Sequence, residues 1–285
     1  MPYKFSLSFA SVFLLLCGQM AFAQSPDPAS KTEEGQFGFR AVAELGFLGV
    51  MGHKVQFGQN TTYFDYRRTG GQDVLFPVSR LSLELDLGPR NTLIFLYQPL
   101  QLETQVVLRD DIQIDDLLFP AGTNLKTLYS FPFYRLSYLR KLNLSSERFE
   151  LALGVSLQIR NAIISFESAD GSLYRSTRDV GPVPILKVRS TFHETDRLFL
   201  ELEADGMYAP ISYLNGSDND VVGAILDASL RQGLQISDEV GTFLNLRYLG
   251  GGAQGISPTN LDITDGYTKN WLHFLTVSAG FSYGF

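Results

Sequence analysis

Residues 149–163 read FELALGVSLQIRNAI, and this stretch decides the fold. From Phe149 to Ile159 every second residue is apolar, and the residues between them are glutamate, alanine, glycine, serine and glutamine. Side chains of a β-strand point alternately to its two faces, whereas an amphipathic helix repeats every ~3.6 residues. The period of two therefore predicts a strand with one apolar and one polar face.

The same alternation returns along the chain. It is clear in residues 37–47, 78–87, 198–204, 222–230 and 271–285, and less regular in residues 92–104, 126–142, 183–192 and 240–249. Four short links join these strands, at residues 88–91, 143–148, 193–197 and 236–239. Five long links alternate with them, at residues 52–76, 105–125, 167–182, 209–220 and 250–270. This layout predicts an all-β fold, a transmembrane antiparallel up-and-down β-barrel of about ten strands with periplasmic termini.

Alternation alone does not show which face is inside, because a soluble lipocalin-like barrel has the same period with its apolar face inward. The charged face is rich in glycine, alanine and serine, which suits a narrow lumen, and aromatic residues gather near strand ends, as interfacial girdles require. The chain ends on Phe285, in phase with Tyr283 and Phe281. This ending resembles the C-terminal signal by which the barrel-assembly machinery recognises outer-membrane proteins.

The N-terminus predicts export. Residues 1–23 have the features of a cleaved signal peptide, with Lys4 followed by an apolar run and an A-x-A site at residues 21–23. Cys17 is the only cysteine, and the leucine before it argues against lipidation. The expected location is the outer membrane.

The rest of the chain divides into two parts. Residues 24–35 carry no periodicity and predict a flexible N-terminal tail, and residues 36–285 predict the outer-membrane barrel. The formal net charge of −7 argues against a nucleic-acid partner. The expected partners are outer-membrane lipid and lipopolysaccharide, with the barrel-assembly machinery during biogenesis, and the barrel is expected to be a monomer.

The charged residues of the polar faces are expected to meet in the lumen. Hairpin geometry places Arg189 opposite Glu201, Lys187 opposite Glu203, Asp227 opposite Arg247 and Arg135 opposite Ser156. Two interpretations stay open, a structural salt-bridge network and a narrow path for ions or solutes, and matched opposite signs favour the network. The predicted lumen charge network comprises Arg40, Glu44, Arg80, Glu84, Arg135, Arg160, Lys187, Arg189, Glu201, Glu203, Asp205, Asp227 and Arg247.

Catalytic constellations are weak, and no catalytic residue, metal site or cofactor is assigned. His193 lies in a predicted turn, and His273 shares the lipid-facing phase, with Leu275 where outer-membrane lipid A deacylases carry serine. His53 opens the first long loop, and the second carries four acids, an acid–His lip that resembles the omptin proteases in outline. The four acids are Asp110, Asp111, Asp115 and Asp116.

Several stretches resemble a family of uncharacterised bacterial outer-membrane β-barrel proteins. They include GGQDVLFPVSRLS from residue 70, IFLYQPLQLETQVVLRDDIQI from 94, GVSLQIRNAIISF from 154, GPVPILKVR from 181, ELEADGMYA from 201 and YLGGGA from 248. The resemblance implies fold and location, and no catalytic residue. Arg160 with Asn161, and Glu203 with Asp205, are the first positions to test for lumen chemistry.

We therefore expect an integral outer-membrane barrel without enzymatic activity, either a structural envelope protein or a narrow small-solute channel. The alternative is a barrel-embedded hydrolase that acts on envelope lipid or peptide at the extracellular lip. That alternative requires His53 to lie within reach of an acid from residues 105–125.

Overall fold

The computed structural model describes residues 37–144, 146, 148–210, 220–256 and 265–285. The chain divides into two compact units, Met1–Glu34 and Gly35–Phe285, and the described residues belong to the second. The predicted signal peptide and tail, residues 1–35, lie outside the described residues. The described part of the chain contains no helix that could span a lipid bilayer.

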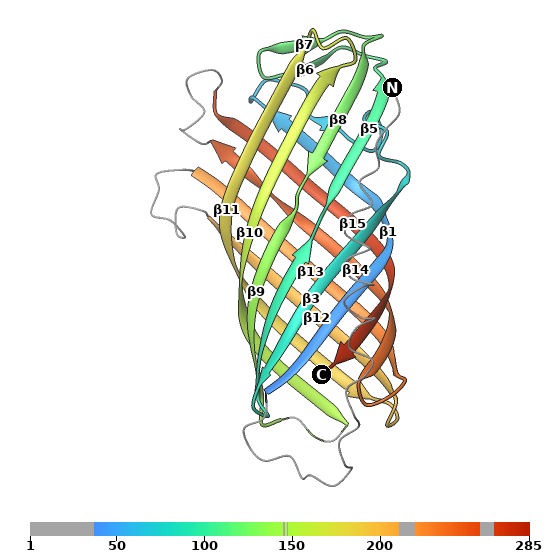
Figure 1. Cartoon of the computed structure of the whole chain (residues 1–285). Coiled ribbons are helices and arrows are strands. Elements are labelled where there is room, and N and C mark those ends of the chain that lie inside the picture. Colours follow the sequence, from blue (N-terminus) through green and yellow to red (C-terminus); the bar gives the residue numbers. More distant parts are fainter. Residues whose placement is uncertain (1–36, 145, 147, 211–219, 257–264) are drawn as a thin grey trace. The chain divides into compact units, whose positions relative to one another are not determined.

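The described residues form strands joined by turns and loops (Figure 1). The strands are β1 (Phe37–Phe57), β2 (Phe64–Asp65), β3 (Leu75–Leu87), β4 (Asn91–Gln98), β5 (Gln101–Val107), β6 (Ile112–Ile114), β7 (Leu117–Phe119), β8 (Asn124–Ser130), β9 (Phe133–Lys141), β10 (Phe149–Ser168), β11 (Tyr174–His193), β12 (Leu198–Pro210), β13 (Asp220–Gln235), β14 (Val240–Ile256) and β15 (Tyr267–Gly284).

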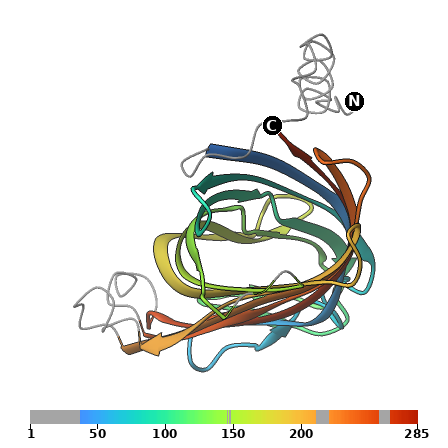
Figure 2. The ribbon, with the colours of Figure 1, turned by 90° about the horizontal axis from the view of Figure 1, so that it is seen from below.

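Ten antiparallel wall strands close on themselves (Figure 2). Two of them are interrupted, because Pro99 separates β4 from β5 and Pro132 separates β9 from β8. The ring runs from β1 through β3, β4/β5, β9/β8 and β10 to β15, and β15 pairs with β1 from Arg40↔Gly284 to Phe57↔Thr268. The predicted ten-stranded up-and-down barrel is confirmed.

We call the end of the barrel that holds the start of β1 and the end of β15 the terminal end, and the opposite end the loop end. Phe39 and Phe285 exchange backbone hydrogen bonds there, and their rings stack with centroids 5.6 Å apart. Phe281, Tyr283 and Phe285 all expose their rings on the outer wall. Their role as an assembly signal stays a prediction.

Connections at the terminal end are short, as predicted, but the strands at the loop end are longer than predicted. β10 and β11 continue to a five-residue turn at residues 169–173, so the expected long loop at residues 167–182 is wrong. Gly171 has a φ of +73°, and the Asp170 carboxylate accepts bonds from the Ser168 and Ser172 hydroxyls. These bonds lower the pKa of Asp170 to about 2 and fix a tight turn.

The strands are longer because the ladder continues regularly while the apolar face changes from the outer to the inner side of the wall. In the first half of β10, Leu153, Val155 and Leu157 are exposed on the outer wall. Beyond Arg160 the buried, inward residues include the apolar Ala162, Ile164 and Phe166, and no register shift intervenes in the β10–β11 ladder. A wall facing lipid carries its apolar residues outside, whereas one facing water carries them inside. The loop-end half of β10 therefore extends the barrel beyond an apolar band.

The loop end is filled by an apolar core. Its members come from the wall and from the segments between wall strands, including β2, β6 and β7. Phe57, Phe64, Tyr66, Phe119 and Phe166 are among its fully buried rings. The ion pairs of the lumen are therefore confined to the terminal-end half, and burial of apolar area stabilises the inside of the loop-end half.

Candidate functional site

The terminal-end half of the lumen holds a compact layer of buried ion pairs, which we call the ion-pair layer. Its acids project from β1, β3, β12 and β13, and its bases from β3, β9, β11, β13 and β14. All lie on inward positions of the wall and have side chains at most 11% exposed. The layer consists of Glu44, Glu84, Glu201, Glu203, Asp205, Asp227, Arg80, Arg135, Lys187, Arg189, Arg231 and Arg247.

Arg135 on β9 lies at the centre of one part of the layer. Its Nη1 lies 2.9 Å from Asp205 and 3.0 Å from Asp227, which are cross-strand neighbours on β12 and β13. Its Nε and Nη2 both donate to the Gln158 side chain, at 3.0 and 2.7 Å. Two carboxylates placed side by side repel each other, so the bridging guanidinium stabilises the pair.

Glu203 collects three cations. Lys187 Nζ lies 2.7 Å from its carboxylate, Arg189 Nη2 2.7 Å and Arg80 Nη2 3.5 Å. Arg189 also reaches across the lumen to Glu84 on β3, at 2.9 Å. This contact joins opposite sides of the wall, which the pairing of adjacent strands cannot do.

Glu44 on β1 is the third centre. Arg231 Nη2 lies 2.7 Å from it, and the Asn245 amide and Ser278 hydroxyl donate to its other oxygen at 2.8 and 3.1 Å. Arg231 also packs its guanidinium 4.9 Å from the ring centroid of Phe243. Charged hydrogen bonds and stacking together hold this side chain in one position.

Charge is balanced within the layer. Six acids face six bases, and each acid pairs with at least two cations, Arg40 at the terminal-end rim serving as the second partner of Glu84. The cavity beside Glu44, Arg80 and Arg247 measures about 10 Å³. A water molecule needs roughly 10–15 Å³ of such space, so this cavity has room for about one water. The lumen is filled at this level.

The predicted network is present, with differences in pairing and membership. Each predicted hairpin register is wrong by two residues: Arg189 faces Glu203, Lys187 faces Asp205, Arg247 faces Ser229 and Arg135 faces Gln158. The predicted partners Arg247 and Asp227 still form an ion pair, diagonally across the ladder. Because a shift of two keeps every side chain on its face, the inward assignment survives the error.

Two arginines were misassigned. Arg231 belongs to the layer although it is absent from the predicted network, and its alternation with Asp227 and Ser229 is the sequence signal for its inward position. Arg160 points inward but lies apart from the layer, toward the loop end, and pairs with Asp179, whose side chain is 58% exposed. Its neighbour Asn161 accepts a bond from Arg178 Nε at 3.0 Å.

The acid–His lip required by the hydrolase alternative does not form around His53. This residue lies within β1 rather than in a loop, and its ring is 1% exposed. Its Nδ1 lies 2.8 Å from the Gln72 side-chain oxygen, and its ring packs against Tyr66, Tyr129 and Phe274. Within the described residues no carboxylate hydrogen-bonds His53.

Two of the four acids in the second loop have structural partners of their own. Asp115 pairs with Arg175 on β11, and Asp111 accepts the backbone N–H of Ala121 at 2.7 Å. No group of three or more His, Cys, Asp or Glu side chains gathers in a metal-binding arrangement in the described part of the chain. The ion pair between Asp115 and Arg175 joins this loop to the wall and helps to close the loop end.

Comparison with known proteins identifies the class of fold. No protein-family model matches the chain, and no curated protein matches its sequence. The outer membrane protease OmpT from Escherichia coli matches with a TM-score of 0.50 and 12% identity, over 87% of this chain and 97% of OmpT. The outer membrane protein AlkL matches with a TM-score of 0.38 and 11% identity, over 92% and 97%. A Pseudomonas aeruginosa FadL homologue gives 0.36 and 10%, over 88% and 90%. The chain therefore has the fold of an outer-membrane β-barrel.

Proposed function

We propose that this protein is an exported, integral outer-membrane barrel with a closed lumen, a non-enzymatic structural protein of the envelope. The observation that carries the proposal is the ion-pair layer, which fills the terminal-end half of the lumen with balanced buried charge. The apolar core fills the loop-end half. A solute would have to displace both.

The outer wall supports the membrane location. Large apolar side chains stand exposed around the terminal-end half of the barrel, on strands from every part of the wall. Examples are Leu45 at 70%, Val155 at 57%, Leu202 at 54% and Leu244 at 66% exposure. A soluble protein rarely leaves so continuous an apolar surface in water, whereas a lipid bilayer covers it. Closure of the ladder leaves no unpaired strand edge inside this band.

The ion-pair layer favours a closed lumen rather than a narrow open channel. Opening a path would separate several buried charges at once, and each uncompensated buried charge costs several kcal/mol. Selective pores keep charged rings of one sign beside a continuous path, whereas here opposite signs are matched and the cavity beside Glu44, Arg80 and Arg247 measures only about 10 Å³. We accordingly propose that the wild-type barrel does not conduct.

The partners follow from this location. We propose a monomer in contact with outer-membrane lipid and lipopolysaccharide, and assembly by the machinery that recognises the C-terminal Phe281, Tyr283 and Phe285. The closed wall offers no strand edge for pairing with a second copy.

Planar-bilayer recording tests the proposal. The refolded barrel is added to a lipid bilayer beside the variant Arg135→Ala/Asp205→Ala, which removes one buried cation and one anion and leaves space without net charge. We expect no single-channel steps from the wild type, and none from the variant either, because the apolar core still fills the loop-end half. Reproducible steps from the wild type would contradict the closed lumen. A heat-dependent shift in gel mobility, measured on both proteins, verifies that the barrels are folded.

A further inference from the structure

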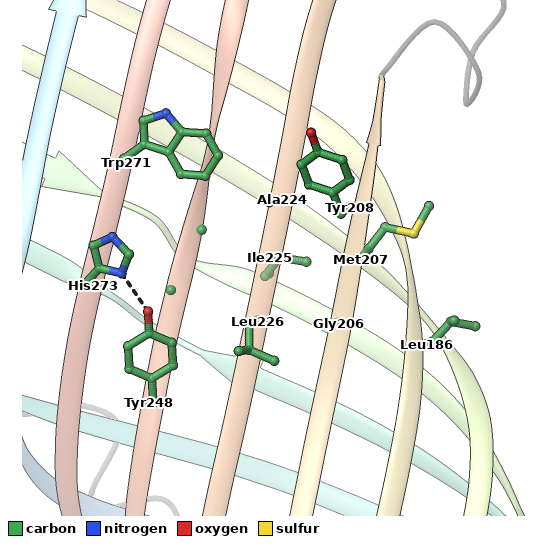
Figure 3. A pocket seen from close by; sticks show the side chains of 12 residues that line it. Leu186, Gly206, Met207, Tyr208, Ala224, Ile225, Leu226, Tyr248, Trp271 and His273 are labelled. Carbon is green, nitrogen blue, oxygen red and sulfur yellow. Dashed lines mark hydrogen bonds between the residues drawn. The ribbon is translucent and has the colours of Figure 1, made fainter.

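The outer wall carries a hollow of about 550 Å³ toward the loop end, between β11 and β15 (Figure 3). Ligand pockets in proteins typically measure about 300–1,000 Å³. The ladders arrange this part of the wall in two rows that cross it. From β15 toward β11 the first row is Trp271, Gly252, Ala224 and Tyr208, and the second is His273, Gly250, Leu226, Gly206 and Leu186.

The hollow exists because small residues form its floor between larger walls. Gly206, Gly250 and Gly251 line the floor, and a Cβ on Gly251 would lie 2.4 Å from the Ala224 carbonyl oxygen, so this position favours glycine. Trp271 and His273 form one wall, and Tyr208, 73% exposed, stands on the other. Three strand spacings of about 4.8 Å separate them, which gives a width of about 14 Å. The hollow is a groove wide enough for an acyl chain.

A polar pair lies inside this apolar groove. Tyr248 Oη and His273 Nδ1 are 2.6 Å apart, and the Tyr248 ring lies over Gly250, where a Cβ would come within 2.4 Å of the hydroxyl. When the phenol donates to Nδ1, the histidine carries its remaining proton on Nε2. That Nε2 hydrogen-bonds no other described residue, so it offers a donor to whatever occupies the groove.

Two lysines lie next to the groove on its loop-end side. Lys54 of β1 pairs across the ladder with Trp271, and Lys269 precedes Trp271 by two positions on the same face of β15. Their Nζ atoms lie 5.5 and 4.7 Å from the ring centroid of Tyr63. Lys54 Nζ lies 3.5 Å from the Asp65 carboxylate, whereas Lys269 has no ion pair within the described residues. The pair forms a local positive patch.

The length of β15 between Trp271 and Phe281 gives the depth of the groove in the proposed membrane. Phe281 marks the aromatic rim of the terminal end on β15, ten positions beyond Trp271. At about 3.3 Å per residue and a tilt near 40°, ten residues span roughly 25 Å, the height of the apolar band of such barrels. Trp271 and the lysines therefore lie at the headgroup level of the leaflet on the loop-end side, with the groove directly below.

We propose that this groove binds one acyl chain of a phosphate-bearing glycolipid of the outer leaflet, lipopolysaccharide. The chain lies on the glycine and alanine floor, its ester or amide carbonyl accepts the bond from His273 Nε2, and a phosphate contacts Lys54 and Lys269. The inference rests on the membrane location proposed above. Lipopolysaccharide is chosen over a phospholipid because the groove and both cations lie at the level of the outer leaflet.

Native mass spectrometry of the refolded, full-length barrel in non-ionic detergent tests this assignment, with purified rough lipopolysaccharide as the probe. Trp271 is the only tryptophan of the chain, so its emission during a titration reports on the groove itself. We expect one retained glycolipid and a saturable emission change. Ala224→Phe, which fills the floor from the lipid side, should abolish both, whereas the matched control Ala43→Phe, near the terminal-end rim, should leave both unchanged.

The lysines are tested with Lys54→Gln/Lys269→Gln. Each cation near an anionic headgroup contributes enough that losing two should weaken the apparent affinity about thirtyfold. Retention by Ala224→Phe equal to that of the wild type would overturn the groove assignment. Equal competition by phosphatidylglycerol would overturn the choice of glycolipid. Heat-dependent gel mobility of each variant reports on the barrel separately, so a failure of glycolipid binding is distinguishable from a failure of the membrane-barrel proposal.

Discussion

Replacement of Arg135 by methionine is the sharpest perturbation of the ion-pair layer. Methionine keeps much of the side-chain length but removes the charge that bridges Asp205 and Asp227 and the two donors that bind Gln158. Breaking a buried pair by removing one partner costs about 3–5 kcal/mol. Both carboxylates keep other cations, Lys187 at 2.8 Å for Asp205 and Arg247 for Asp227. We therefore expect the lower end of this range, about 3 kcal/mol, which is roughly a 150-fold change in the folding equilibrium.

The assay is urea unfolding of the refolded barrel in lipid vesicles, followed by the emission of Trp271. The companion variant is Arg135→Met/Asp205→Asn, which restores charge balance with five acids and five bases in the layer. It should recover at least about 1 kcal/mol relative to Arg135→Met, because neighbours in one charge network couple by about 0.5–3 kcal/mol. A free energy of unfolding within about 0.5 kcal/mol of the wild type for Arg135→Met would refute the reasoning. The reasoning would also be refuted if Asp205→Asn lowered the free energy of unfolding of Arg135→Met further instead of recovering part of it.

Three further outcomes are expected. Arg160→Gln should cost less than about 1 kcal/mol in the same urea titration, because its partner Asp179 is largely exposed; a loss as large as that of Arg135→Met would contradict the separation of Arg160 from the layer. Gly252→Ala should destabilise the barrel by about 1–3 kcal/mol, since its Cβ would collide with the Asn270 carbonyl, and an unfolding midpoint equal to that of the wild type would argue against this packing. Phe285→Ala removes the ring stacked on Phe39 and should slow the appearance of heat-modifiable barrel during refolding or export; unchanged yield would remove the support for an assembly role.

The hydrophobic period alone predicted most of the wall. Leu153, Val155 and Leu157 face outward, and Arg135, Glu203 and Asp227 face inward, as the alternation predicted. The predicted registers were wrong by two, and this error changed partners without changing faces, because the side-chain period of a strand is also two. Loop lengths were predicted less well. Residues 167–182 were expected to form a long loop, but they hold the end of β10, a five-residue turn and the start of β11.

The contents of the lumen depended on closure. Arg189 reaches Glu84, 105 positions away in the chain, and Arg231 reaches Glu44, 187 positions away. No local pattern contains these distances, since they depend on strand tilt, on shear and on the diameter of the ring. Nor does local pattern show that His53, polar and placed near a predicted loop, enters the apolar core against Tyr66 and Tyr129.

The sequence by itself determined that the chain is an antiparallel barrel, which face of each strand is inside over the terminal-end half, and that charged residues gather in the lumen. These properties follow from side-chain alternation, which is written residue by residue. Only the tertiary structure decided that buried ion pairs fill the terminal-end half of the lumen, that Arg231 joins the layer while Arg160 does not, and that a glycine-floored groove lies on the outer wall beside Trp271. Those properties arise when the ten-strand ring closes, because closure alone places residues of distant strands within contact distance.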